Sequence, residues 1–325
     1  MIEILTTGLP NTVQDLGRPG LLSLGISHGG AMDSQALAIA NLMLGNDRSA
    51  AGLEIALYPF RLKANIDTAL AVTGADCPIG VGDRRYPPWW ATTIRADETL
   101  VLEAPRAGAR SYIAFAGGLD RPPVMGSRAT DVKGGFGGLA GRGLARGDRL
   151  QLNATKCPLP SGGLGAALQQ RRATGDGAAS PVELRVLPAA EFDAFTAQAQ
   201  AAFTGSDWSI TSDANRMGYR LSGETLSLTS PLELLSHGIV PGTIQVPPSG
   251  QPIIQLADAN TCGGYPKIAT VIEADLWRLA QAPVGARLRF VPVSIEAATQ
   301  ALRAARQELD AFAARNVGVV GLRPG

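Results

Sequence analysis

The sequence has few residues of the kinds that hold metals or cross-link chains. It contains two histidines, His28 and His237, and three cysteines, Cys77, Cys157 and Cys262. Neither histidine stands four residues from a second histidine or a cysteine, as in helical zinc motifs. The cysteines are odd in number and lack C-x-x-C spacing. We therefore expect no bound metal and no disulfide framework.

Charge and long apolar runs are also scarce. Charged residues make up 18% of the chain, with 29 basic and 28 acidic side chains and no basic stripe, which argues against nucleic acid as a partner. No uncharged apolar run approaches the roughly 20 residues that cross a bilayer. Residues 1–5 (MIEIL) resemble a first strand and lack the features of a signal peptide. We expect a cytoplasmic protein that does not associate with membranes.

Two common nucleotide-binding motifs are missing as well. The sequence has no G-x-x-x-x-G-K-[ST] loop and no G-x-G-x-x-G at the start of a helix. The sequence therefore predicts no self-contained nucleotide site.

What the sequence does contain is many short apolar runs separated by glycine, proline and aspartate. This spacing predicts a mainly β protein, an all-β barrel or sandwich. The expected strands are residues 2–6, 69–73, 99–102, 111–116, 149–152, 183–187, 225–228, 253–257, 269–272 and 287–291. Three helices are expected: residues 34–44 with Asp33 as N-cap, residues 189–203, and residues 294–316 with Ser294 as N-cap.

Composition divides the 325 residues into two halves. Residues 153–180 are rich in Gly, Ala, Gln and Pro, as in a linker or mobile arm. Before and after it, GDRLQL at 147–152 resembles GARLRF at 285–290, and each half has an earlier glycine pair. We interpret this as two divergent copies of one β-barrel. The expected domains are 1–152 and 181–293, followed by a C-terminal helix and tail at 294–325.

The most informative loop is residues 258–268 (DANTCGGYPKI), between two expected strands. It is longer than a hairpin needs and carries an acid, an amide, a thiol, a phenol and an amine. Paired glycines let backbone N–H groups approach a ligand. A second polar loop, residues 245–252 (QVPPSGQP), lies one strand earlier. The two loops can frame one pocket, although a solvated hairpin loop has a similar composition.

Further polar clusters lie in the N-terminal half. In the run SHGGAMD at 27–33, glycines precede the N-terminus of an expected helix, whose free backbone N–H groups favour binding of an anion. Asp33, as the N-cap, already accepts hydrogen bonds from some of these N–H groups. His28 can act as a general base or be structural. Asp76 lies at the end of an expected strand, where an aspartate can either form a turn or belong to a functional site. Around Gly134-Gly135, the loop 126–138 is dense in glycine and fits anion recognition or a mobile surface loop.

The second half supplies the strongest single candidates. Lys267 follows Gly-Gly-Tyr-Pro, where the glycines clear space and Tyr265 can stack or donate a hydrogen bond. Arg216 offers a planar fork for a carboxylate or phosphate, whereas Lys267 is a compact charge. Cys262 suggests a nucleophile, but no histidine lies near it in the sequence, which weakens that interpretation.

Taken together, these runs resemble one family. They are TVQDLGRPG at 12–20, GAMD at 30–33, TGAD at 73–76, GSR at 126–128, GGFGGL at 134–139, NRMGYRL at 215–221, VPG at 240–242, QVPPSGQP at 245–252 and GGYPKIATV at 263–271. In this order they are similar to the biotin-dependent carboxyltransferase family, also called the allophanate hydrolase subunit 2 or KipI antagonist family. The resemblance covers nearly the whole chain.

The resemblance implies two cyclophilin-like β-barrels with a few peripheral helices. It also implies the C component of an ATP-dependent 5-oxoprolinase, which works with a KipI-like B component and an A component to convert 5-oxoproline to glutamate. ATP is then used by the assembled complex, and its site can lie on a partner protein. The chain lacks the Met-Lys-Met that carries covalent biotin. The sequence leaves homo-oligomerisation open.

On this resemblance we assign roles to the candidates. Lys267 and Arg216 would neutralise a carboxylate or an oxyanion, with His28 as a further catalytic candidate. Backbone donors would come from Gly134, Gly135, Gly263 and Gly264. Side chains expected to contact a small amide substrate are Gln245, Gln251, Asn260, Asp258, Tyr265, Asp76 and Asp33.

Two departures and two alternatives accompany this assignment. The family commonly reads P-S-G-A-M-D where this chain has His28-Gly29-Gly30-Ala31-Met32-Asp33, and has glutamine where this chain has Asn260. A side chain one methylene shorter can move an amide out of hydrogen-bond reach.

One alternative function is a carboxyltransferase component for urea or a related amide, working with a biotin carboxylase. The other is a non-catalytic protein that binds a KipI-like kinase inhibitor.

Overall fold

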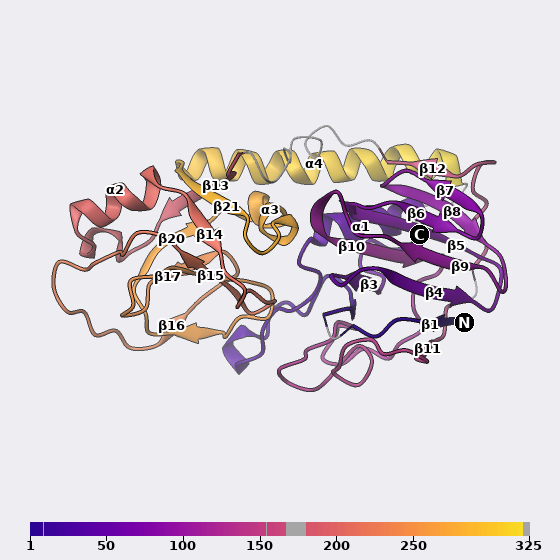
Figure 1. The fold of residues 1–325 in the computed structure, drawn as a ribbon, viewed down its shortest axis with the longest axis horizontal. Coiled ribbons are helices and arrows are strands. Elements are labelled where there is room, and N and C mark those ends of the chain that lie inside the picture. Colours follow the sequence, from indigo (N-terminus) through magenta and orange to yellow (C-terminus); the bar gives the residue numbers. More distant parts are fainter. Residues whose placement is uncertain (9, 154, 167–179, 321–325) are drawn as a thin grey trace. The chain divides into compact units, whose positions relative to one another are not determined.

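The chain forms two compact units that are rich in β structure (Figure 1). The computed structural model describes residues 1–320 except 9, 154 and 167–179. The first unit contains Met1–Arg18, Gly29–Arg172 and Gln307–Gly325, and the second contains Pro19–His28 and Ala173–Arg306. Each unit has its own sheet system, so the prediction of a mainly β protein with two barrel-like parts is confirmed.

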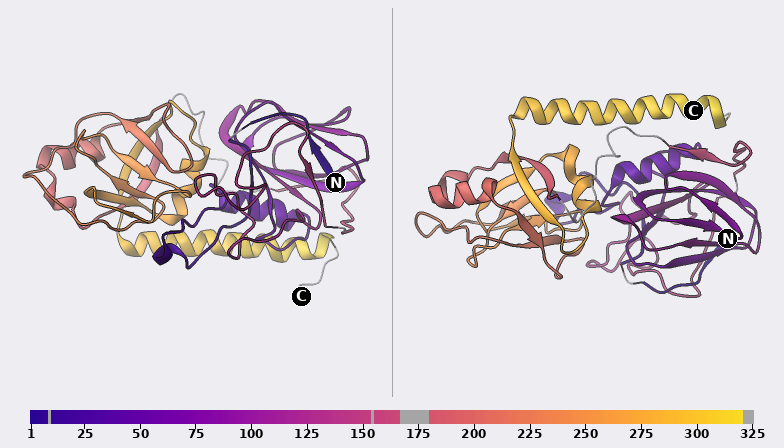
Figure 2. Two further views of the ribbon diagram at one scale, coloured as in Figure 1. Left: turned by 90° about the horizontal axis from the view of Figure 1, so that it is seen from below. Right: turned by 45° about the horizontal axis from the view of Figure 1, so that its top comes forward.

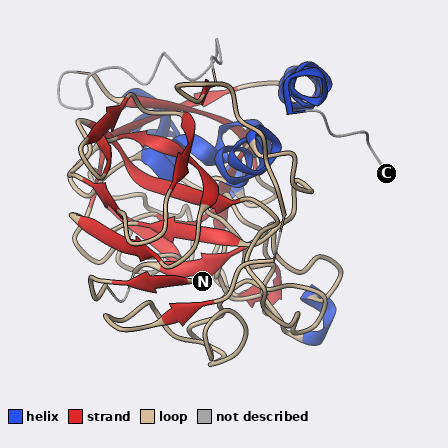
Figure 3. Ribbon diagram, turned by 90° about the vertical axis from the view of Figure 1, so that its right-hand side faces the viewer, coloured by secondary structure: helices blue, strands red, loops and turns tan. Residues whose placement is uncertain are grey.

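Two six-stranded antiparallel sheets build the first unit. The strands of one sheet are β1 (Ile2–Ile4), β4 (Phe60–Ala64), β6 (Ile79–Val81), β7 (Arg84–Tyr86), β9 (Thr99–Leu102) and β11 (Arg149–Leu150). Those of the other are β2 (Thr12–Gln14), β3 (Gly52–Ile55), β5 (Thr68–Asp76), β8 (Trp90–Ile94), β10 (Ala107–Phe115) and β12 (Leu164–Gly165). Their orders are β11-β1-β4-β9-β6-β7 and β12-β8-β5-β10-β3-β2, and Figure 3 shows their strands in red.

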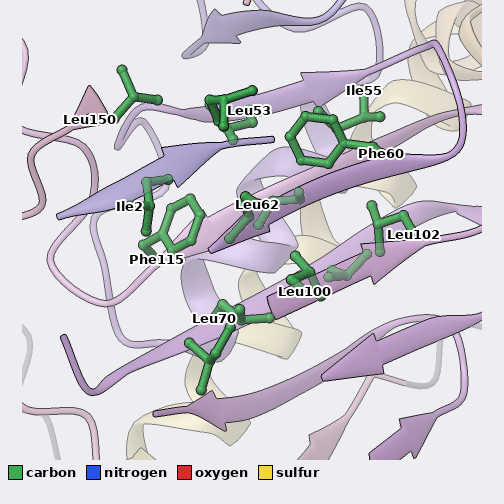
Figure 4. Packing of buried hydrophobic residues seen from close by; sticks show 14 of the residues in the cluster. Ile2, Leu53, Ile55, Phe60, Leu62, Leu70, Leu100, Leu102, Phe115 and Leu150 are labelled. Atoms are coloured by element: carbon green, nitrogen blue, oxygen red, sulfur yellow. The ribbon is translucent and has the colours of Figure 1, made fainter. Parts of the chain in front are cut away.

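Apolar side chains from both sheets share one core (Figure 4). Phe60 and Leu62 on β4 and Leu53 on β3 are fully buried in it. On β4 the buried residues alternate with exposed or half-buried ones, as the two-residue period of a strand requires. The shared core explains why two separate sheets behave as one barrel-like body.

Helix α1 (Ser34–Met43) packs on the sheet that contains β5 and β10. The Asp33 side chain accepts a hydrogen bond from the Ala36 backbone N–H at 3.0 Å, so the predicted N-cap is confirmed. The Thr73 hydroxyl on β5 donates to the Ala36 carbonyl oxygen at 2.7 Å, which ties the first turn of the helix to the sheet.

A closed seven-stranded barrel forms the centre of the second unit (Figure 1). In the order around the barrel, its strands are β13 (Val182–Pro188), β20 (Lys267–Val271), β17 (Thr243–Gln245), β18 (Ile253–Gln255), β15 (Gly218–Ser222), β14 (Trp208–Ile210) and β21 (Arg287–Pro292). β13 and β21 pair in parallel and close the barrel. A separate ribbon of two strands joins β16 (His237–Gly238) to β19 (Cys262–Gly263).

The helical segments of the second unit differ in part from the prediction. Residues 189–203, expected as one helix, contain the 3-10 turn η3 (Phe192–Ala194) and then α2 (Ala197–Gly205), whose N-cap is Thr196. Threonine accepts a hydrogen bond from the Ala199 N–H at 3.1 Å and starts the helix there. The other helical segments are η1 (Leu22–Leu24), η4 (Glu273–Asp275) and α3 (Leu276–Gln281).

Helix α4 (Ile295–Val320) is unbroken in both views of Figure 2. Its predicted cap is confirmed, because Ser294 Oγ accepts a hydrogen bond from the Ala297 N–H at 3.2 Å. Leu309 and Phe312 pack against an apolar cluster of the first unit that includes Ala40 of α1. Among the described residues, no helix combines the length and the apolar character needed to cross a membrane.

The expected strands overlap observed ones with one exception. Residues 225–228 form no strand; Leu228 makes only an isolated bridge to Phe195. The expected linker, residues 153–180, is also wrong in part, because β12 pairs with β8 and Trp90 Nε1 donates to the Gly162 carbonyl oxygen at 3.0 Å. Residues 154 and 167–179 of that segment lie outside the described residues. Contacts also group Pro19–His28 with the second unit, although we expected this segment in the N-terminal domain.

Candidate functional site

Lys267 lies at the start of a barrel strand and is buried. It is the first residue of β20 and only 7% exposed, although we expected it in an open loop. Its ladder partner on β17 is Gln245. Residues directly opposite each other on antiparallel strands project to the same face, so the ladder brings together an amine and an amide from the two polar loops that the sequence singled out.

The Lys267 ammonium group contacts His237, which the sequence analysis had not assigned to the site. Lys267 Nζ lies against His237 Nε2. The other ring nitrogen, Nδ1, lies 3.0 Å from the Leu235 carbonyl oxygen. A carbonyl only accepts hydrogen bonds, so Nδ1 carries the proton and Nε2 of the neutral ring is an acceptor. The imidazole lone pair therefore faces the lysine.

Glu191 is the carboxylate of this cluster. Its Oε2 accepts a hydrogen bond from the Lys267 backbone N–H at 3.1 Å, and its Oε1 lies 3.8 Å from His237 Nε2. Burial lowers the pKa of the Lys267 ammonium group, and the negative charge of Glu191 partly opposes that shift. The cluster thus brings an ammonium group, an imidazole ring and a carboxylate together in one small region.

Gln245 adds a buried amide to this cluster. The side chain is 4% exposed, and its Oε1 accepts a hydrogen bond from Gln255 Nε2 at 3.0 Å. Its Nε2 is buried and makes no hydrogen bond to any of the described residues. A Cβ atom on Gly263 would lie 2.6 Å from this nitrogen, so Gly263 covers it closely. A buried N–H without an acceptor is costly, and a ligand oxygen would satisfy it.

Arg216 and Asp258 bind each other. Arg216 Nε and Nη2 lie 2.8 and 2.9 Å from the two carboxylate oxygens of Asp258, and both side chains are largely buried. Both residues were expected to contact substrate. The structure shows that the carboxylate bound by the Arg216 fork is that of Asp258, which fixes the start of the 258–268 loop.

The remaining candidate residues of the second unit are either more exposed than Lys267 or form hydrogen bonds to the backbone. The Gln251 side chain binds the backbone of Gly223 at both ends of its amide. Its Oε1 accepts a hydrogen bond from the Gly223 N–H at 2.9 Å, and its Nε2 donates one to the Gly223 carbonyl oxygen at 3.3 Å. Tyr265 is 48% exposed, and its carbonyl oxygen lies 3.5 Å from Lys267 Nζ. Other positions are half-buried or exposed: Gly264, His28, Asn260 and Cys262.

The candidates of the first unit have local structural partners. Asp33 is fully buried as the cap of α1, and its N–H donates to the Tyr112 hydroxyl at 2.8 Å. Asp76 ends β5, where its carbonyl accepts from the Arg106 N–H at 2.7 Å. These residues belong to the first unit and Lys267 to the second.

The expectation that Gly134 and Gly135 offer free backbone donors needs correction. The Gly134 N–H donates to Asp131 Oδ1 at 2.7 Å, and the Gly135 N–H donates to the Asp131 carbonyl at 2.9 Å. A Cβ on Gly134 would lie 2.4 Å from the Phe136 ring, and Gly135 has a φ of 69°. These glycines are needed for a tight turn, and Asp131 already occupies their donors.

Sequence reasoning missed His237 and Glu191. His237 was considered only as a metal ligand, and Glu191 lay inside a predicted helix. Their contacts with Lys267 span 30 and 76 residues, so no local spacing reveals them. Among the described residues, no group of three His, Cys, Asp or Glu side chains is arranged to hold a metal ion.

Comparison with known proteins shows which family this chain resembles over its length. A family model described as carboxyltransferase domain, subdomain A and B, matches residues 24–292. The chain is 45% identical over 302 residues to the C subunit of the 5-oxoprolinase from Escherichia coli, covering 93% of this chain and 94% of that protein. It is 39% identical over 307 residues to the C subunit of the 5-oxoprolinase from Haemophilus influenzae, and the match covers 93% of this chain and 94% of that protein.

A solved structure of the Kluyveromyces lactis urea amidolyase is also similar. It has a TM-score of 0.85 and 26% identity, over 96% of this chain and 20% of that larger chain. The match to the family model spans both units of this protein, including Lys267, His237, Glu191 and Gln245. The chain therefore belongs to the family of carboxyltransferase domains with subdomains A and B.

Proposed function

We propose that the chain is the C component of an ATP-dependent 5-oxoprolinase, which converts 5-oxoproline to glutamate. The observation that carries this proposal is the 45% identity to the corresponding E. coli protein, which extends over nearly the full length of both chains. The site residues lie within the matched region. ATP is used by the assembled complex, and we assign none of its contacts to this chain.

The chemistry of the Lys267 cluster suits this substrate class. 5-Oxoproline carries a ring amide and a carboxylate. Lys267 supplies a buried positive charge for a carboxylate or a developing oxyanion, where low dielectric strengthens the interaction. Gln245 Nε2, which bonds to none of the described residues, supplies a donor for a carbonyl oxygen.

We further propose that the chain acts only within a cytoplasmic complex with an A component and a KipI-like B component. The relatives from E. coli and H. influenzae are both named as subunits and match this chain over almost their whole length. The partners would bring ATP to the reaction, because the sequence contains no phosphate-binding loop of its own.

Coexpression of this chain with its two partner proteins tests the proposal. ATP hydrolysis and glutamate release are measured with 5-oxoproline, with urea and without substrate. We expect stimulation by 5-oxoproline alone, and we expect it to require all three proteins. A complex that assembles and hydrolyses no ATP in response to 5-oxoproline contradicts the proposal.

The second candidate is a carboxyltransferase component for urea or a related amide. The structural similarity to the K. lactis urea amidolyase favours it. Urea and 5-oxoproline share the amide group that Gln245 and Lys267 would bind, so this site alone separates them poorly. Turnover of urea together with a biotin carboxylase would support this candidate. Binding of a KipI-like protein without any turnover would support a non-catalytic role.

A further inference from the structure

We propose that His237 is the general base of this site, and that substrate binding releases it from Lys267. This inference rests on the proposed function and deepens it by assigning a proton carrier. In the structure, the Lys267 ammonium group donates to His237 Nε2. A substrate carboxylate or carbonyl oxygen that binds Lys267 replaces Nε2 as its acceptor and leaves the imidazole lone pair free.

The first step of the argument concerns the orientation of the ring. His237 pairs with Gly263 across the β16–β19 ribbon, and its Nδ1–H donates to the Leu235 carbonyl oxygen at 3.0 Å. This bond fixes the tautomer with the proton on Nδ1. The basic nitrogen is thereby directed toward Lys267. A ligand oxygen that binds Lys267 in place of Nε2 therefore lies next to this basic nitrogen.

The second step concerns access and charge. The His237 side chain is 44% exposed, whereas Lys267 and Gln245 are buried. A base at the exposed margin of the cluster can exchange protons with water. The charged groups that contact the ring are Lys267 on β20 and Glu191 before η3. Glu191 Oε1, 3.8 Å from Nε2, offsets the positive charge that the ring gains with a proton.

The proton steps of the hydrolytic part of the reaction balance as follows for an amide substrate, and the complex consumes ATP in a separate step that we do not assign to this chain. A water molecule gives one proton to His237 Nε2 while its oxygen bonds to the amide carbonyl carbon. Lys267 and Gln245 Nε2 stabilise the negative charge on the former carbonyl oxygen. The C–N bond then breaks, and the leaving nitrogen takes the proton back from Nε2. The ring returns to its neutral form, and the carboxyl group and the amine are the products.

One test needs only the isolated full chain. With two histidines in the sequence, a 15N–1H correlation spectrum of labelled rings gives two sets of signals, and a His237→Asn variant identifies those of His237. At slightly alkaline pH we expect the His237 ring to carry its proton on Nδ1 and none on Nε2. A ring protonated on Nε2 overturns the assignment, whether or not the chain proves to be part of a 5-oxoprolinase.

A second test uses the coexpressed complex. His237→Asn keeps a donor near the Nδ1 position and removes the base, so kcat should fall about a hundredfold while KM changes little. Ser236→Ala, an exposed neighbour, is the matched control and should leave both constants unchanged. A His237→Asn complex with wild-type kcat overturns the proposal. A wild-type complex without 5-oxoproline turnover refutes the proposed function instead, and the ring spectrum then decides the role of His237.

Discussion

Lys267 Nζ and His237 Nε2 are in contact although the two residues stand 30 positions apart in the sequence. The barrel ladder places Lys267 on β20, and a separate two-stranded ribbon places His237 beside it. Each partner restricts the other, because the ammonium group occupies the lone pair of the ring and the ring provides an acceptor for a desolvated cation. This pair, with Glu191 and Gln245, is the centre of the candidate site.

The charge of Lys267 should matter more than its exact shape. In the coexpressed complex, Lys267→Met removes the cation while keeping most of the volume, and we expect kcat/KM to fall at least tenfold, about 1.4 kcal/mol. Lys267→Arg keeps a positive charge and should retain more activity than Lys267→Met. Lys63→Met, on the surface of the first unit, is the control. Equal kcat/KM for wild type and Lys267→Met would remove this residue from the site.

Gly263 should control the position of the Gln245 amide. A Cβ at Gly263 would lie 2.6 Å from Gln245 Nε2, whereas Gly238, on the facing strand of the same ribbon, has open space around its Cβ position. We expect Gly263→Ala to lower kcat/KM about tenfold with a stability change below about 1 kcal/mol, because the amide end of a side chain can move aside. Gly238→Ala should behave as wild type. If both variants keep full activity, Gln245 does not bind substrate.

The Arg216–Asp258 pair should be a stabilising element of the second unit. Asp258→Asn leaves the largely buried Arg216 guanidinium without its carboxylate, and breaking a buried ion pair from one side costs about 3–5 kcal/mol. Urea unfolding measures this loss. The double variant Arg216→Met/Asp258→Leu should recover part of it, since no lone charge remains. A loss below about 1 kcal/mol in Asp258→Asn would mean that Arg216 reaches solvent or another anion.

Burial of Lys267 should make stability depend on pH at alkaline values. Because burial lowers the pKa of Lys267 in the folded protein, the unfolded chain keeps that proton to higher pH. Between the lowered pKa and the ordinary value of 10.5, the unfolded state binds more protons, so the free energy of unfolding gains a positive contribution as pH rises through this window. Below the lowered pKa this contribution is constant. Wild type should therefore gain stability relative to Lys267→Met on going from neutral to alkaline pH, and parallel curves would contradict the shift.

The hydroxyl of Tyr112 should stabilise the first unit. This fully buried group donates to Glu54 Oε2 at 2.9 Å and accepts from the Asp33 N–H at 2.8 Å. Tyr112→Phe leaves both partners short of a bond, so we expect a loss of about 1–3 kcal/mol in the free energy of unfolding. Tyr86→Phe, half-buried on β7, should change it by less than about 0.5 kcal/mol. Equal stability of the two variants would indicate that water replaces the Tyr112 hydroxyl.

Much of the fold was predictable from local patterns. The apolar runs of β5, β9 and β21 and the caps of α1 and α4 depend on residues a few positions apart, and these predictions are confirmed. Short polar strands such as β16 and β19 were missed because two residues carry no usable period. Residues 225–228 have strand-like composition, yet no neighbouring strand pairs with them beyond one bridge.

By itself the sequence determined the family and the mainly β class and singled out Lys267 as a candidate, because ordered motifs and apolar spacing are written along the chain. Only the tertiary structure decided which groups meet Lys267. Barrel closure and strand register bring His237 and Glu191 to it from distant positions. The same long-range folding pairs Arg216 with Asp258, 42 residues away, in an internal ion pair. A side chain's partner depends on three-dimensional proximity, and proximity across strands is fixed only when the sheet closes.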